Sequence, residues 1–422
     1  MRTFLFLLAG VSLLAASTAA VAGSRAPRTP DEPVPPPLTA DQAAASVNAF
    51  AVALYGELAG GSGNLFFSPA SLQFALGMLA AGARGATAAE LAAVCRWPSD
   101  LRAIHPGLHD LQQALAPRDP EHVTWSSANR LWGQAGYRLL PEYRALVAQW
   151  YAGGYQAVDF RADSEAARRT INAWVADRTN DRIRDLLPAG TVDGDTRLVL
   201  TNAVYFLADW DHPFVPRHTR DDPFHLAGGG TVTVPLMQTI ERYPYTAIGM
   251  LDRRVQLLEL PYGGGDYAMD VLLPATADGL PALEQQLTPQ RLAEWLASLR
   301  TRRVHCYLPK FSMQRRFFLH DTLAAMGMQT AFSGRADFSG ITGRPDLSVS
   351  DVIHQAFLKV DETGTEAAAA TGITLKATSV RPVEKPVEFR ADHPFLLLIR
   401  HRPTGAILFM GRVMDPTANG AG

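Results

Sequence analysis

The sequence predicts an α+β fold in one large domain. Apolar residues recur at helical spacing through most of the first half of the chain, whereas from Phe224 onward most apolar segments have the length and residue types of strands. Nothing between Thr39 and Pro416 is interpreted as a boundary between two domains, and no internal repeat is evident in this segment. With 422 residues, 47% of them hydrophobic, the chain can bury a large core.

Residues 1–22 have the layout of a secretory signal peptide. A basic residue precedes a short apolar run, and a pattern of small residues predicts cleavage after Ala22. Because the apolar run is short for a bilayer span, we expect a secreted or periplasmic protein with no membrane attachment after cleavage. Residues 23–38 are rich in Pro and charge, which predicts an extended tether before the domain at residues 39–417.

The helices follow from capping signals and from apolar residues spaced three and four apart. Thr39 and Gln42 have the spacing of a capping box, and the helix that starts there is expected to end at the glycines at positions 60 and 61. The next helix, from Ser71 to about Ala81, is almost wholly apolar and is therefore expected to be buried. Further helical patterns cover residues 87–115, 138–151, 164–187, 280–299 and 319–326.

The strands are apolar segments bounded by turn residues. Residues 197–207 form a nearly continuous apolar run, as expected of a strand that is covered on both faces at the centre of a sheet. The glycine triplets at 228–230 and 263–265 lie between strands and predict turns rather than phosphate-binding loops. Other strands are expected at residues 123–131, 231–237, 254–260, 267–273, 303–311, 348–360, 387–390, 395–401 and 406–413.

Motifs of catalysis and cofactor binding do not occur in the sequence. It has no Gly-x-Ser-x-Gly, no His-Glu-x-x-His, no Gly-rich nucleotide fingerprint and no cysteine cluster. His105 and His109 have helical spacing beside Asp110, but no third ligand is apparent, so a surface helix is preferred to a metal site. The dipeptide His320-Asp321 fits a helix start equally well. With a net charge of -2, we expect no nucleic-acid partner, and we expect no cofactor or metal.

Cys95 and Cys306 are the two cysteines of the chain. An exported protein could join them in a disulfide, but a single, far-separated pair is not a disulfide framework. Burial as two small apolar side chains is at least as well supported, and both alternatives stay open at this point.

Residues 361–386, DETGTEAAAATGITLKATSVRPVEKP, have the composition of a flexible linker but the alternation of a strand. When residues 365–377 are laid out as an extended chain, the odd-numbered positions carry the large aliphatic residues Ile373 and Leu375, and the even-numbered positions carry the charges of Glu366 and Lys376. A half-buried strand requires this separation. The segment is therefore exposed in composition and yet able to become a strand.

Five segments, in the order given, carry a more specific signal. They are NLFFSPAS from Asn64, INAWVADRTNDRIRDLLP from Ile171, LTNAVYFLADW from Leu200, VDETGTEAAAAT from Val360 and HPFLLLIRHRPTGAILFMGRVMDP from His393. Together these segments resemble the serpin family, in its bacterial secreted type, and they cover nearly all of the chain after the tether. One segment alone would be weak, but five in the family's order are specific.

The resemblance implies a serpin fold of three β-sheets and about nine helices, with an exposed reactive-centre loop at about residues 362–388. In inhibitory serpins a serine protease attacks this loop, forms an acyl-enzyme, and is trapped covalently when the cleaved loop inserts into the main β-sheet. The expected function is suicide-substrate inhibition of serine proteases by a monomer without catalytic residues of its own. The alternative is a non-inhibitory serpin that acts as a binding or carrier scaffold.

Individual positions match the motifs of the family. The loop hinge corresponds to Glu362, Gly364, Thr365, Glu366, Ala367, Ala368, Ala369 and Ala370. The polar cluster beneath the point where the main sheet opens corresponds to Ser68, Ser71, Asn202 and His354, with Trp210 at the top of the opening. Gly364 is expected to supply backbone freedom where the chain doubles back, and the cluster is expected to tune the opening rather than to perform chemistry.

The reactive bond is placed by counting from the hinge. When Glu362 is counted as the first of the seventeen residues that usually precede the bond in this family, the bond lies between Thr378 and Ser379. A small or β-branched residue before the bond points to elastase-like or subtilisin-like proteases. Ala377 is an alternative with much the same specificity, whereas Lys376 would recruit trypsin-like proteases.

Overall fold

The computed structural model describes residues 36–151, 154–250, 254–365 and 385–418. The signal peptide predicted at residues 1–22 and most of the predicted tether lie outside the described residues. Internal contacts group Val34–Gly422 into one compact unit.

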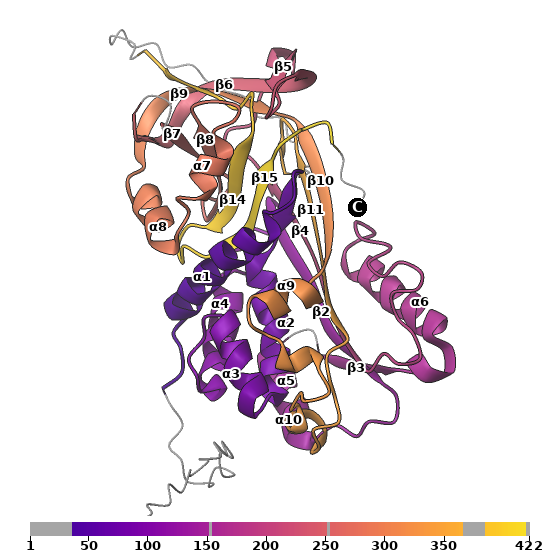
Figure 1. Cartoon of the computed structure of the whole chain (residues 1–422). Coiled ribbons are helices and arrows are strands. Elements are labelled where there is room, and N and C mark those ends of the chain that lie inside the picture. Colours follow the sequence, from indigo (N-terminus) through magenta and orange to yellow (C-terminus); the bar gives the residue numbers. More distant parts are fainter. Residues whose placement is uncertain (1–35, 152–153, 251–253, 366–384, 419–422) are drawn as a thin grey trace, which may run out of the picture. The chain divides into compact units, whose positions relative to one another are not determined.

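Helices pack around two groups of strands, which makes an α+β fold as predicted (Figure 1). The described helices are α1 (Ala40–Leu58), α2 (Pro69–Gly82), α3 (Gly85–Val94), α4 (Ile104–Ala114), α5 (Pro141–Trp150), α6 (Phe160–Arg178), α7 (Leu280–Glu284), α8 (Pro289–Ala297), α9 (His320–Ala325) and α10 (Ser339–Thr342). Short 3-10 turns lie at Leu101–Ala103, Pro216–His218 and Thr330–Phe332.

The predicted start of the first helix is confirmed. The Gln42 amide donates a hydrogen bond to the Thr39 hydroxyl at 3.2 Å, and the Thr39 amide donates one to the Gln42 side chain at 2.9 Å, so the capping box is complete. Helix α2 begins at Pro69, where a proline costs no helical hydrogen bond. Every residue of α2 is buried, as its apolar composition predicts.

Helix α6 agrees with the prediction at its start but not at its end. The span Phe160–Arg178 is broken at Asp163 (φ -155°, ψ 88°), so the continuous helix begins at Ser164 as predicted, and it ends at Arg178 rather than near residue 187. Asn180 and Asp181 follow with φ angles of 46° and 60°, which a right-handed helix does not accommodate. The apolar residues beyond this break are still buried, so their spacing indicated burial and not a continued helix.

The strands form two hydrogen-bonded sheets. They are β1 (Leu65–Phe67), β2 (Val123–Gln134), β3 (Tyr155–Val158), β4 (Leu198–Asp209), β5 (Arg220–His225), β6 (Thr231–Ile248), β7 (Val255–Pro261), β8 (Tyr267–Pro274), β9 (Arg300–Pro309), β10 (Phe311–Phe318), β11 (Asp351–Val360), β12 (Gly364–Thr365), β13 (Val387–Arg390), β14 (Phe395–His401) and β15 (Ile407–Val413). The single strand expected at 303–311 is divided between β9, which pairs with β6, and β10, which pairs with β11.

The larger sheet has nine strands in the order β1-β15-β14-β8-β7-β6-β9-β13, with β5 beside β6. The long strand β6 pairs first with β5, then with β9, and at its end with β7. Because β6 joins two groups of strands into one sheet, the three sheets expected for this fold appear as two continuous sheets among the described strands.

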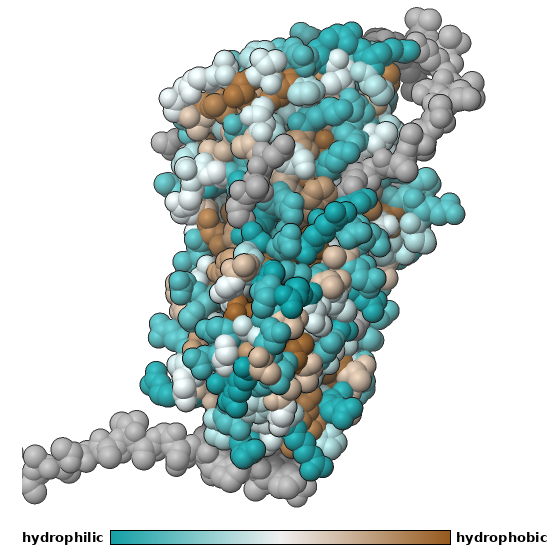
Figure 2. Space-filling model, turned by 90° about the vertical axis from the view of Figure 1, so that its right-hand side faces the viewer, coloured by the Kyte–Doolittle hydropathy of each residue, from teal (hydrophilic) through white to brown (hydrophobic). Residues whose placement is uncertain are grey.

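The smaller, six-stranded sheet has the order β10-β11-β12-β4-β2-β3, with β4 in its interior, as predicted. One face of this sheet packs against α6, where Ile171 and Val175 lie in one buried cluster with Ala203 of β4 and Ile353 of β11. Figure 2 shows the molecule from the side of α6, where hydrophilic side chains are frequent on the surface. The other face of the sheet, including Leu200 and other alternate residues of β4, joins the main core.

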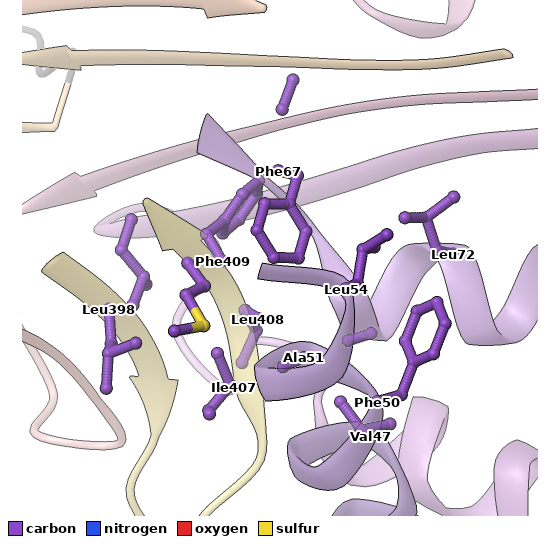
Figure 3. Close-up of a cluster of buried hydrophobic side chains, with 14 of the residues drawn as sticks. Val47, Phe50, Ala51, Leu54, Phe67, Leu72, Leu398, Ile407, Leu408 and Phe409 are labelled. Carbon is purple, nitrogen blue, oxygen red and sulfur yellow. The ribbon is translucent and has the colours of Figure 1, made fainter. Parts of the chain in front are cut away.

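The main core lies between the N-terminal helices and the last strand pair (Figure 3). Phe50 and Leu54 of α1 are fully buried with Leu408 and Phe409 of β15. The Phe409 ring also stacks on Phe66 of β1, with 5.0 Å between ring centroids. This packing fixes the start of α2 beneath the six-stranded sheet.

Candidate functional site

The six-stranded sheet opens between two neighbouring strands, β4 and β11. β4 and β11 are directly paired in parallel from Val199–Asp351 to Tyr205–Phe357. Beyond that point the two strands are separated by β12, which pairs with both of them in antiparallel fashion. The residues that follow β11 along the chain therefore already occupy the upper end of the gap.

Two residues of the predicted hinge fill this gap. Thr365 lies between Val360 of β11 and Ala208 of β4, and its side chain is fully buried. Gly364 faces Asp209, and a Cβ atom built on Gly364 would lie 2.0 Å from the carbonyl oxygen of Ala208. The φ angle of Gly364 is not in the positive range, so the expectation that this glycine supplies unusual backbone freedom is not met. It is required here because the neighbouring backbone leaves no space for a side chain.

Residues 361–364, which we call the hinge turn, reverse the chain between β11 and β12. The Asp361 amide donates a hydrogen bond to the Gly364 carbonyl at 2.9 Å. Glu362 is held from outside the turn by the Lys310 ammonium at 2.7 Å and by the Thr219 hydroxyl at 2.9 Å. Although burial raises the pKa of Glu362, the hydrogen bonds from Lys310 and Thr219 outweigh it, and the net pKa is lowered.

Trp210 lies beside the hinge turn at the end of β4. Its backbone amide donates to the Thr363 carbonyl at 2.9 Å, and its indole Nε1 donates to the Asp361 carbonyl at 3.0 Å. The indole ring stacks on the ring of Tyr262, with 4.5 Å between centroids and 8° between the planes. The tryptophan predicted at the top of the opening thus touches the hinge directly.

A row of polar side chains crosses the sheet below the opening. Asn129 of β2, Asn202 of β4 and His354 of β11 are register partners on neighbouring strands. The Asn202 amide donates to the Asn129 side-chain oxygen, and its own oxygen accepts from Nδ1 of His354. The hydrogen bond between Asn202 and His354 thus joins the two strands that a new strand would have to separate.

The start of α2 completes this polar cluster. Ser68 donates its backbone amide to Nε2 of His354 at 3.0 Å and its hydroxyl to the Leu408 carbonyl at 2.6 Å. The Ser71 hydroxyl accepts from the Asn202 amide at 2.5 Å. Ser68, Ser71, Asn202 and His354 therefore form one hydrogen-bonded group, which also includes Asn129.

His354 is neutral in this cluster, with the proton on Nδ1. Its Nε2 must accept from the Ser68 amide, so Nδ1 is left to donate to Asn202. Burial lowers the pKa of His354 to about 3. The cluster contains no nucleophile paired with a base, and its chemistry is that of a neutral structural network.

The remaining residues predicted for the loop lie outside the described residues. They are Glu366, Ala367, Ala368, Ala369 and Ala370 of the hinge and Lys376, Ala377, Thr378 and Ser379 around the reactive bond. The structure describes the chain again from Lys385, just before β13.

The histidines considered for a metal site have structural partners. His105 Nδ1 lies 2.6 Å from the Tyr151 hydroxyl, and the ring of His109 packs edge-on against Trp150. His320 begins α9, which agrees with the helix-start interpretation. Among the described residues, no group of three or more His, Cys, Asp and Glu side chains could hold a metal ion. None of the helices that these residues form is long and apolar enough to span a bilayer.

Cys95 and Cys306 are both buried and are not joined to each other. Burial raises the pKa of both thiols, which makes them unreactive as thiolates. The structure therefore favours the second alternative, two small apolar side chains in the core.

Several residues of the site were not singled out from the sequence. Asn129 was missed because its membership in the polar row depends on strand register. Lys310 and Thr219 were missed because they approach Glu362 from distant parts of the chain. Tyr262 stands next to the glycine turn at 263–265, and the sequence itself gives no signal that this turn lies beside the hinge.

Comparisons with known proteins agree with this geometry. The profile of the family described as "Serpin (serine protease inhibitor)" matches residues 45–416. The chain is 40% identical to leukocyte elastase inhibitor A of Mus musculus, covering 89% of this chain and 100% of that protein. It is 41% identical to an uncharacterized serpin-like protein of Thermococcus kodakarensis, covering 88% of this chain and 85% of that protein.

Solved structures give the same result. Uncleaved ovalbumin is similar with a TM-score of 0.79 and 31% identity, covering 89% of this chain and 100% of that one. Serpin48 of the insect Tenebrio molitor is similar with a TM-score of 0.80 and 30% identity, covering 89% of this chain and 98% of that one.

Proposed function

Because this chain belongs to the serpin family, we propose that it is a suicide-substrate inhibitor of serine proteases. A target protease would cleave the segment between β12 and β13 and would be held as an acyl-enzyme while that segment inserts between β4 and β11. The observation that carries this proposal is β12, which already lies between these two strands.

The register of β12 defines the path that the inserting segment would follow. Continued without a bulge, it places Thr371 between Asn202 and His354, six positions beyond Thr365 on one side and six before Ala208 and Val360 on the other. The direct pairing of Asn202 with His354 has the same register, so both neighbours agree on this position. The Thr371 hydroxyl would then stand in the polar cluster where the Asn202–His354 bond had been.

The same register sets the length of the inserted strand. Ten positions beyond Thr365, Leu375 would reach Leu198, the first residue of β4. A bond between Thr378 and Ser379 lies just past this end, so cleavage there would free enough chain to fill the whole gap. The alternatives Ala377 and Lys376 also lie past it.

Side-chain parity supports the same path. The Thr365 side chain points into the main core, so Ile373 and Leu375, which share its parity, would be buried on insertion. Glu366 would lie on the opposite face, in the row of Lys359, which is exposed and positively charged. The sequence thus places apolar residues inward and a favourable charge pair outward.

Insertion would also be favourable in free energy. One parallel ladder between β4 and β11 would be replaced by two antiparallel ones, which are slightly more stable per residue. About a dozen new backbone hydrogen bonds at about 1 kcal/mol each give on the order of 10 kcal/mol. The uncleaved fold would then be kinetically rather than thermodynamically stable.

We assign elastase-like or subtilisin-like proteases as targets because a small or β-branched residue, Thr378 or Ala377, precedes the proposed bond. The name of the mouse relative, a leukocyte elastase inhibitor, supports the elastase class. Lys376 remains the alternative that would select trypsin-like proteases. We further propose that the protein is exported through residues 1–22 and acts as a monomer without a cofactor.

The test is incubation with active elastase and subtilisin. We expect an SDS-resistant complex, and no such complex with a protease whose active-site serine is replaced by alanine. If every active protease only cleaves the loop and is released, the inhibitory proposal fails. Melting temperatures before and after loop cleavage then test the non-inhibitory alternative, because an inserting loop raises the melting temperature sharply and a non-inserting loop does not.

A further inference from the structure

The described residues place one phenol directly beneath the hinge. The Tyr262 hydroxyl lies 2.7 Å from the Thr365 hydroxyl, and both side chains are fully buried. Tyr262 comes from the turn between β7 and β8, in the other sheet, whereas Thr365 belongs to the predicted reactive-centre loop and is its last described residue before position 385. This contact therefore connects the loop to a part of the molecule that does not take part in insertion.

Tyr262 is held firmly in its own position. Its amide donates to the Tyr267 carbonyl at 2.9 Å, and its ring packs edge-on against Phe206 and stacks on Trp210. The Gly263 amide donates to the Asp209 carbonyl at 2.8 Å, which ties the same turn to the end of β4. The phenol is thus a rigid group, and the hinge is the part that can move.

We propose that Tyr262 is a positioning residue that seats Thr365 in the sheet, so that the cleaved loop starts its insertion from a first residue already in register. If Thr365 left the gap, the Tyr262 hydroxyl would lose this partner while still buried, which is unfavourable. The seated hinge is therefore the preferred state. This inference deepens the proposed function and rests on it for its inhibitory consequence.

The contact also gives a reason for a threonine at the second position of β12. A threonine fits the space between Ala208 and Val360 and presents a hydroxyl to Tyr262. A valine would fill the same space without a hydrogen bond. Burial raises the pKa of Tyr262, so its hydroxyl stays protonated and available over the physiological pH range.

Amide hydrogen exchange on the uncleaved protein tests, without any protease, whether Tyr262 holds Thr365 in the sheet. The Trp210 and Phe214 amides donate to the carbonyls of Thr363 and Glu362, so they exchange when the hinge turn leaves its place. We expect Tyr262→Phe to lower the protection of these two amides about five- to tenfold. Unchanged protection in this variant would overturn the proposal.

A double-variant cycle distinguishes loss of the hydrogen bond between Tyr262 and Thr365 from a general loss of packing. Thr365→Val should lower the protection of the Trp210 amide as much as Tyr262→Phe does, and the double variant should lower it no further. Additive losses would contradict the proposal. The matched control is Tyr267→Phe, which removes another buried hydroxyl, bonded to the Leu115 carbonyl at 2.7 Å, and should leave the Trp210 amide protected.

The stoichiometry of inhibition gives the functional consequence. Tyr262→Phe should consume several times more inhibitor per trapped protease than the unsubstituted chain or Tyr267→Phe. An unchanged stoichiometry, together with lost amide protection, would overturn the role of Tyr262 in insertion. If no variant traps a protease while the amide-exchange results are as expected, the proposed function fails, but the positioning of Thr365 by Tyr262 is still supported.

Discussion

Replacement of Thr365 by arginine tests the insertion mechanism most directly. The Thr365 side chain is fully buried between Ala208 and Val360 and in contact with the Tyr262 hydroxyl. An arginine there must either bring an unpaired charge into the core or keep β12 out of the sheet. Removing such a charge from water costs several kcal/mol, for which about 4 kcal/mol is a reasonable value.

That cost acts on a competition between two rates. In the proposed mechanism, loop insertion after cleavage competes with hydrolysis of the acyl-enzyme, and about 4 kcal/mol added to the insertion barrier would slow insertion about 10³-fold. Thr365→Arg should therefore be cleaved as a substrate, with nearly every protease molecule released. The uncleaved variant should still fold, because β12 contributes two residues to the sheet.

The assay is titration of elastase or subtilisin with the variant, followed by SDS electrophoresis and by the residual protease activity. Glu366→Gln is the control, because residue 366 has the opposite parity and should remain at the surface. Undiminished inhibition by Thr365→Arg would refute insertion at this residue. Equal loss of inhibition in both variants would refute the assignment of residue 365 to the buried face and residue 366 to the exposed face.

Three further predictions concern stability and the hinge. The pKa of His354 is lowered from 6.5 to about 3, so the unfolded chain binds the proton first and this residue's stabilisation, complete above pH 6.5, is lost as the pH falls towards 3. The free energy of unfolding, measured by urea titration between about pH 7 and pH 4, should fall by up to about 1.4 kcal/mol per pH unit, and less steeply in His354→Gln. Glu362→Gln weakens the contact with Lys310 and should lower the free energy of unfolding by about 0.5–1 kcal/mol in urea titrations, whereas no change would show the pair to be energetically neutral. Gly364→Ala should unseat β12 by steric overlap and raise the stoichiometry of inhibition, and a variant as efficient as the unsubstituted chain would contradict the close approach.

Local signals in the sequence were sufficient for much of the fold. The capping box at Thr39 and the proline at the start of α2 depend on neighbouring residues, so they could be identified without tertiary information. The apolar run of β4 could be assigned to the sheet interior because both of its faces must be covered. For these elements, short-range chemistry and burial agree.

Strand boundaries required information that the sequence pattern does not contain. The change from β9 to β10 at Lys310 is a change of partner and not of composition, so residues 303–311 resembled one strand. Most of β10 was missed because several of its central residues, including Arg315 and Arg316, are polar and only partly buried.

The candidate site divides in the same way. Ser68, Ser71, Asn202 and His354 were identified by resemblance, and the structure brings them into one hydrogen-bonded group. The reason for Gly364 was wrong, because the requirement for glycine comes from the opposing carbonyl of another strand rather than from a backbone angle. Contacts between segments distant in sequence, such as Tyr262 with Thr365, have no local signal.

The parallel pairing of β4 with β11 has a consequence for how the chain folds. His354 and Asn202 are 152 residues apart, whereas the loop that could pair with β11 follows it immediately in the sequence. On sequence separation alone, a local hairpin of β11 with the loop would form first. Residues Asp351–Phe357 of β11 pair with β4 instead, and Thr365 is the last described residue that pairs with β11 as part of such a hairpin.

The composition of the loop supplies a reason. Alanine and glycine, which fill most of positions 366–372, are poor strand formers, so a hairpin with β11 alone is weak until β4 offers a second edge. The small residues that would ease the proposed insertion after cleavage would therefore also delay pairing during synthesis and folding. A loop rich in valine or isoleucine at these positions would be expected to fold directly into the inserted form, and the chain would then lose the proposed inhibitory state before meeting a protease.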